Sequence, residues 1–153
     1  MARVRTIRID RGWRGLKASA LGLNGRAVKV GILAGSGSNE GVSLVDIAVF
    51  NEFGTERIPS RPFMRRTADT SEDRVRAFGR AQAKAVMSGK ARADQVLDRI
   101  GLWYQSRVRE TIRTAFQWAA PNAPSTVRRK GSSRPLIDTG MLHGAVNYEK
   151  TRL

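Results

Sequence analysis

The run Asp138-Thr139-Gly140 is the part of the sequence whose residue types most directly suggest chemistry. Aspartic proteases carry an apolar residue followed by Asp-Thr-Gly, and two such carboxylates share one proton. A half-size enzyme of that kind could supply the second aspartate by dimerising. However, only 13 residues follow Gly140, fewer than such a fold places after its aspartate. We therefore expect a structural role, in which Asp138 caps a short helix and Gly140 makes a tight turn.

Two further features that could carry chemistry are better explained structurally. The glycine-rich segment 35–41 follows a predicted strand, as phosphate-binding loops do, but it lacks their Lys-Ser/Thr ending. His143 is the single histidine and the chain has no cysteine, so a metal site or a serine triad would be hard to assemble. We therefore expect no enzyme activity, no cofactor and no small-molecule substrate. Residues 34–43 are interpreted as an exposed, flexible loop or hairpin tip.

A basic cluster is the clearest candidate for contact with a partner or with DNA. Its members are Arg128, Arg129, Lys130 and Arg134. Side chains of this kind can contact phosphates or an acidic neighbouring protein, and a solvated loop without a partner is an equally good interpretation. The cluster contains no aromatic residue, so stacking on single-stranded bases is not indicated. We expect a mobile loop over about 121–135, because the segment is basic and contains Pro, Gly and Ser.

The overall charge indicates which class of partner the chain would attract. Lys and Arg total 28 against 13 Asp and Glu, which gives a net charge of +15 in 153 residues. Such a surface attracts polyanions, so a basic nucleic-acid-binding protein of the cytosol is one hypothesis. No apolar run approaches the ~20 residues of a membrane span, and no apolar segment follows the basic start as in a signal peptide. We therefore expect no membrane contact.

The elements that would position these residues follow from periodicity and from the placement of Gly and Pro. The expected strands cover 4–9, 28–33 and 145–150, and the expected helices cover 13–23, 44–53, 62–87 and 92–116, with a short turn or helix over 136–142. For 44–53 a strand is the alternative. We expect a single domain over residues 1–153 of the α+β class, in which a small, mostly antiparallel sheet packs against two longer helices, with flexible loops.

Two motifs resemble those of the phage virion-morphogenesis and tail-completion proteins. The first is Asn-Glu-Phe-Gly-Thr over 51–55, followed by Ile-Pro-Ser-Arg-Pro-Phe-Met-Arg over 58–65. The second is Asn-Ala-Pro over 122–124, then the basic cluster and Leu-Ile-Asp-Thr-Gly-Met-Leu over 136–142. The resemblance implies a structural role for Glu52, Phe53, Gly54, Pro59, Arg61, Pro62, Phe63, Asp138, Thr139 and Gly140.

The resemblance also implies a function and a place. Such proteins are structural parts of the virion neck, made in the host cytoplasm, and they complete the tail or join it to the head as a ring, sixfold in the family. The implied partners are the tail tube or tail terminator protein and the head–tail connector proteins, with DNA entering the neck as a further contact. Within the first motif we expect Glu52 to pair with Arg61, and Phe53 and Phe63 to insert beneath the proline-rich linker.

Overall fold

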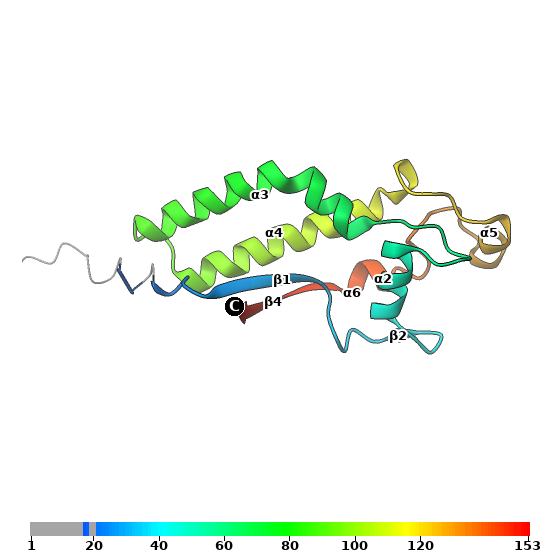
Figure 1. Cartoon of the computed structure of the whole chain (residues 1–153), viewed down its shortest axis with the longest axis horizontal. Coiled ribbons are helices and arrows are strands. Elements are labelled where there is room, and N and C mark those ends of the chain that lie inside the picture. Colours follow the sequence, from blue (N-terminus) through cyan, green and yellow to red (C-terminus); the bar gives the residue numbers. More distant parts are fainter. Residues whose placement is uncertain (1–16, 19–20) are drawn as a thin grey trace, which may run out of the picture.

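The computed structural model has three layers along its longer part (Figure 1). The first layer is helix α3 (Phe63–Met87), which packs on helix α4 (Ala93–Arg113). Helix α4 in turn packs on a two-stranded antiparallel sheet of β1 (Arg26–Ile32) and β4 (Val146–Arg152). This arrangement confirms the predicted α+β class, with a small antiparallel sheet against two longer helices.

Smaller elements gather at one end of the three layers (Figure 1). They are strands β2 (Ser38–Asn39) and β3 (Val42–Ser43), helix α2 (Leu44–Phe53), the 3₁₀ helix η1 (Ala115–Gln117), helix α5 (Pro124–Lys130) and helix α6 (Met141–Ala145). Helix α2 confirms the choice of helix over strand for this segment. Strands β2 and β3 confirm the expected hairpin tip, and its two turn residues, Glu40 and Gly41, have φ of 50° and 80°. Two positive φ angles are typical of the tight turns that join paired strands.

The structure describes residues 17, 18 and 21–153. The strand predicted over 4–9, and most of the helix predicted over 13–23, lie outside the described residues. The remaining predicted strands, 28–33 and 145–150, correspond to β1 and β4, which pair in antiparallel register along their whole length.

The segment 121–135, predicted as a loop, contains a helix instead. Helix α5 starts at Pro124 and ends before Gly131, whose φ of 65° is left-handed. Proline is favoured at a first helical position and glycine just past the last, so these two residues delimit a short helix. The prediction of a loop was wrong because it rested on the polar composition of the segment, whereas Pro124 and Gly131 are the residues that indicate a short helix.

The main core lies where α3, α4, α6 and the sheet meet. Phe63, Val108, Ile112 and Val146 are completely buried there, and Val30 of β1 packs against them. Val108 and Ile112 are one helical turn apart, so both project from the same face of α4. The first residue of α3 is thus anchored in the core, which fixes where the preceding linker ends.

Gly101, on the face of α4 that meets β4, lies directly against the ring of Tyr148. A Cβ atom at this position would lie 2.3 Å from Cδ2 and 2.6 Å from Cγ of Tyr148. The Tyr148 hydroxyl donates a hydrogen bond to Asp98 Oδ1 over 3.3 Å, which restrains the ring. The position therefore requires glycine although it is inside a helix.

We expect Gly101→Ala to lower the free energy of unfolding by about 2 kcal/mol, because the overlap with Tyr148 outweighs the roughly 1 kcal/mol that alanine gains in a helix. Gly79→Ala in α3 is the matched control, since the space around its Cβ position is open. That variant is expected to gain up to about 1 kcal/mol. Urea denaturation measures both changes, and a stabilised Gly101→Ala variant would show that the contact is loose.

Candidate functional site: a groove between the two motifs

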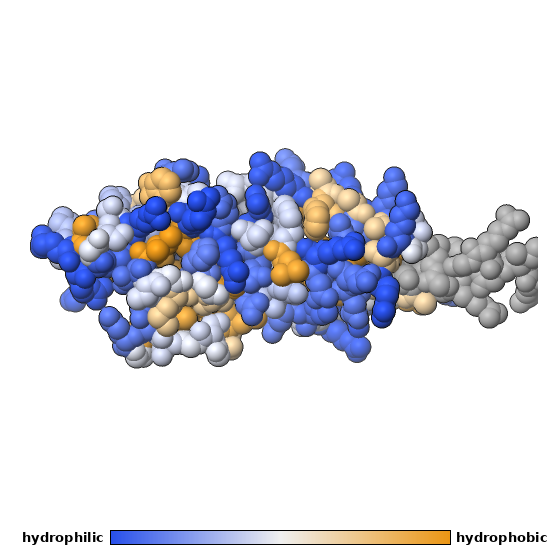
Figure 2. All heavy atoms as spheres, turned by 180° about the vertical axis from the view of Figure 1, so that it is seen from behind, coloured by the Kyte–Doolittle hydropathy of each residue, from blue (hydrophilic) through white to orange (hydrophobic). Residues whose placement is uncertain are grey.

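A groove of about 450 Å³ opens at the end of the molecule where the smaller elements gather. It is lined by α2, the β2–β3 hairpin, the linker before α3, α5 and the segment before α6. The two motifs, far apart in the sequence, therefore line the same groove. Figure 2 shows several apolar patches at this end of a mostly hydrophilic surface. Exposed apolar side chains in the groove lining are Val42, Phe50 and Met141.

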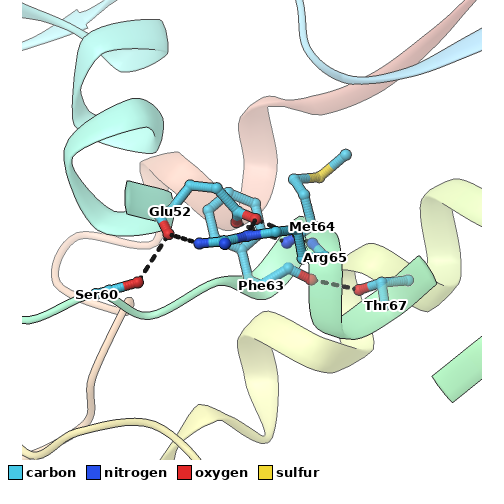
Figure 3. A network of polar contacts seen from close by, with 6 residues as sticks. All are labelled: Glu52, Ser60, Phe63, Met64, Arg65 and Thr67. Carbon is cyan, nitrogen blue, oxygen red and sulfur yellow. Dashed lines mark hydrogen bonds and ion pairs between the residues drawn. The ribbon is translucent and has the colours of Figure 1, made fainter. Parts of the chain in front are cut away.

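Glu52 holds the start of α3 (Figure 3). The residue is only 6% exposed, and its carboxylate accepts hydrogen bonds from the backbone N–H groups of Met64 (2.9 Å) and Arg65 (3.0 Å). Arg65 Nε donates a third hydrogen bond over 3.2 Å. The first N–H groups of a helix have no partner inside the helix, and a negative charge beside them is favourable. Glu52 is therefore the cap of α3, although it belongs to α2.

The predicted pair between Glu52 and Arg61 is wrong, because each side chain is engaged elsewhere. The buried guanidinium of Arg61 donates from Nε to the carbonyl oxygen of Ala120 over 2.8 Å. Its Nη2 donates to the carbonyl of Pro121 over 3.0 Å and to Oδ1 of Asn122 over 3.2 Å. Burial lowers the pKa of Arg61 from its ordinary value. Arg61 thus ties the first motif to the start of the second.

Of the two phenylalanines expected beneath the linker, one is buried and one is not. Phe63 is fully buried, as predicted, whereas Phe53 is 67% exposed. The buried face of α2 carries Ala48 and Glu52, which are four residues apart and share one side of the helix. Phe53, one residue further on, points away from that side. Its ring instead contacts Arg65, whose Cζ lies 5.3 Å from the ring centroid.

The other residues of the first motif shape the linker. Gly54 ends α2 with φ of 80° and ψ of 171°, a conformation almost restricted to glycine. Pro62 lies directly before the first turn of α3, and Pro59 lines the groove. Ser60 Oγ donates to the carbonyl oxygen of Glu52 over 2.9 Å (Figure 3), so the linker is held against the end of α2.

The basic cluster lies on α5 and on the segment after it, and its members differ in what they contact. Lys130 Nζ donates to the carbonyl oxygens of Arg134 (3.0 Å) and Ile137 (2.6 Å), so it joins α5 to the second motif. Burial lowers the pKa of Lys130, and the nearby Asp138 opposes that shift. The ammonium group of Lys130 is therefore engaged within the chain. Arg129 is exposed, and its Nη1 lies 3.9 Å from a carboxylate oxygen of Glu40.

The remaining two cations of the cluster are also exposed. Arg128 and Arg134 point to the surface, and the Cζ of Arg134 lies 6.0 Å from the ring centroid of Phe116. The three arginines of the cluster are therefore exposed at the surface, whereas Lys130 joins α5 to the second motif.

The Asp-Thr-Gly run lies at the groove, and one of its two expected local roles is found there. Gly140 has φ of 81°, which confirms the tight turn, and it occupies the position directly before α6. Asp138 was expected to cap this helix, and that prediction is wrong, because Gly140 occupies the capping position and has no side chain that could accept a hydrogen bond. The Thr139 hydroxyl accepts a long hydrogen bond of 3.4 Å from the Met141 N–H.

The exposed apolar residues of the groove were not predicted, although the sequence of α2 gives a sign of them. Helix α2 carries apolar residues on nearly every side, so burying one face against the core leaves others exposed. Within the described residues, no three His, Asp or Glu side chains come together in a way that could hold a metal ion.

Comparisons with models of known protein families, with curated proteins and with solved structures found no match. None of the helices in the described part of the chain is both long and apolar enough to cross a membrane. The resemblance of the two motifs to tail-completion proteins therefore stays a prediction, and the groove is the feature from which a function can be proposed.

Proposed function

We propose that this chain is a structural protein of a tailed-phage virion, located in the neck, where it completes the tail or joins it to the head. The observation that carries the proposal is that both motifs resembling the tail-completion family line one groove and are joined through Arg61. In this arrangement Glu52 and Arg61 connect segments of the chain, as expected of a structural part. The chain acts as a subunit of a ring, and its contacts with neighbours supply its function.

The groove is the proposed contact surface. Exposed apolar residues such as Phe50 and Met141 are set among polar ones, a pattern that marks protein interfaces. Arg57 and Arg129 also line it and add positive charge. These features fit a partner segment that inserts an apolar side chain and carries carboxylates beside it. The proposed partners are the tail tube or terminator protein, the connector proteins, and neighbouring copies in the ring.

Phe50→Glu tests this surface in the phage itself, by complementing a phage that lacks the gene. We expect the substitution to weaken the contact by on the order of a hundredfold, because an unpaired carboxylate in an apolar interface costs a few kcal/mol. Virions should then lack the protein, and infectious particles should be lost. The measurements are mass spectrometry of purified particles and plaque counts.

The matched control is Leu102→Glu, which introduces the same charge at another exposed apolar residue, on α4 and outside the groove. Virions with Leu102→Glu should contain the protein and infect normally. Both variants should keep the unfolding midpoint of the unmodified chain. Normal incorporation of Phe50→Glu would remove the groove from the interface, and intact infectious virions without the chain would refute the neck role itself.

A further inference from the structure

A second cleft, of about 460 Å³, runs along the seam between α3 and α4, apart from the groove. Three arginines line it: Arg66 and Arg74 from α3 and Arg107 from α4. We call it the arginine cleft. Hydroxyl groups of Thr70, Ser71, Thr111 and Thr114 and the amide of Gln117 also line it. The hydroxyls of Thr70, Thr111 and Thr114 donate to carbonyl oxygens one helical turn earlier, so the guanidinium groups are the main donors that the lining offers to a ligand.

The positive charge of the arginine cleft is only partly offset within the described part of the chain. None of its three arginines forms a salt bridge with a carboxylate there, although Arg65, Arg76 and Arg113 do. Glu110 lines the cleft as well and is the one carboxylate among the described residues of its lining. It accepts two hydrogen bonds from Arg113, at 2.8 and 2.7 Å, and these bonds, with the charges of Arg113 and Arg107, lower its pKa. The cleft therefore keeps unpaired guanidinium groups, which a bound anion would neutralise.

Two tryptophans hold two of these guanidinium groups in place. The Cζ of Arg66 lies 4.9 Å from the ring centroid of Trp118, and the Cζ of Arg107 lies 5.9 Å from that of Trp103. A guanidinium stacked on an aromatic face loses rotational freedom but keeps N–H donors for a ligand.

We infer that the arginine cleft binds the phosphodiester backbone of a nucleic acid. Phosphate contacts in proteins come mainly from Arg and Lys and from Ser, Thr and Gln side chains, which is the composition of this lining. A protein partner would instead favour an apolar centre, as the groove has and this cleft lacks. On α3 the lining extends from Arg66 to Arg74, about 12 Å of helix, which matches about three phosphates of one strand at roughly 3.4 Å each. The net charge of +15 adds long-range attraction.

The test is fluorescence anisotropy of a labelled DNA duplex of about two helical turns, titrated with the full chain at several salt concentrations. We expect the double variant Arg66→Gln/Arg74→Gln to bind more weakly. It should also lower the slope of log affinity against log salt by about 2, one for each lost phosphate contact. Arg107→Lys keeps the charge but loses the paired donors of arginine, so weaker binding is expected there too.

The control double variant, Arg76→Gln/Arg80→Gln, removes the same charge from the same helix outside the cleft. Its salt slope should change by less than about 1. Equal losses in the two double variants would overturn the inference, because binding would then follow net charge alone. Polyglutamate that displaces the duplex as strongly as unlabelled DNA does would point to an acidic protein instead. Absence of duplex binding by the unmodified chain would also overturn it.

This inference does not depend on the neck role, because it concerns a different surface from the groove. A variant of the arginine cleft that loses DNA binding should still enter virions in the complementation assay. Phe50→Glu should conversely keep its DNA affinity. The two experiments therefore fail or succeed separately.

Discussion

Replacing Glu52 with alanine is expected to lower the free energy of unfolding by about 3–4 kcal/mol. The variant loses three hydrogen bonds to a nearly buried carboxylate, and hydrogen bonds to charged groups contribute about 1.5–3 kcal/mol each before the losses overlap. The N–H groups of Met64 and Arg65 are then left without an acceptor in a partly buried place. The first turn of α3 should loosen, and with it the linker that lines the groove.

Urea denaturation followed by circular dichroism measures this loss, and two variants calibrate it. Glu52→Gln keeps one side-chain acceptor, so we expect a smaller loss of about 1–2 kcal/mol. Glu72→Ala removes an exposed carboxylate of α3 that pairs with Arg76, and such surface pairs contribute at most about 1 kcal/mol. If Glu52→Ala cost no more than Glu72→Ala, Glu52 would not be the cap of α3.

Gly54→Ala should be about as severe, with an expected loss of about 3 kcal/mol or more. The backbone at this position has φ of 80° and ψ of 171°, where a side chain costs about 1–3 kcal/mol in strain alone. An added Cβ would also lie 2.9 Å from the backbone nitrogen of Ser60 and 3.1 Å from the carbonyl oxygen of Ile58. These are backbone atoms of the linker, so relief requires moving the linker itself.

Gly131→Ala separates strain from overlap. Gly131 also has a left-handed conformation, with φ of 65°, but nothing lies within 4 Å of its Cβ position. Its loss should be about 1 kcal/mol, from backbone strain only. Thermal unfolding of both variants is the measurement. A Gly54→Ala variant that unfolds at the same temperature as Gly131→Ala would show that the linker can shift without cost.

Most elements of the described chain could be predicted from the sequence, because the signals that define them are local. Gly54 marks the end of α2, Pro62 lies before α3, and Ser88-Gly89 ends it. The same kind of signal was present at Pro124 and Gly131 but was outweighed by composition, which explains the missed helix α5. Periodicity likewise predicted β1 and β4, but a long helical connection permits either strand direction, so their antiparallel pairing was decided by the fold.

What only the tertiary structure decided is which partner each side chain meets. Glu52 and Arg61 are nine residues apart and of opposite charge, so the sequence alone favoured a pair. In the fold, the Glu52 carboxylate instead accepts from a backbone N–H group at the start of α3. The Arg61 guanidinium donates to the carbonyl oxygen of Ala120, far away in the sequence. The groove and the arginine cleft are also properties of the packed elements, because each is lined by residues from segments far apart in the chain. Local residue order determines helices, strands and turns, whereas a surface that binds a partner exists only once those elements are packed together.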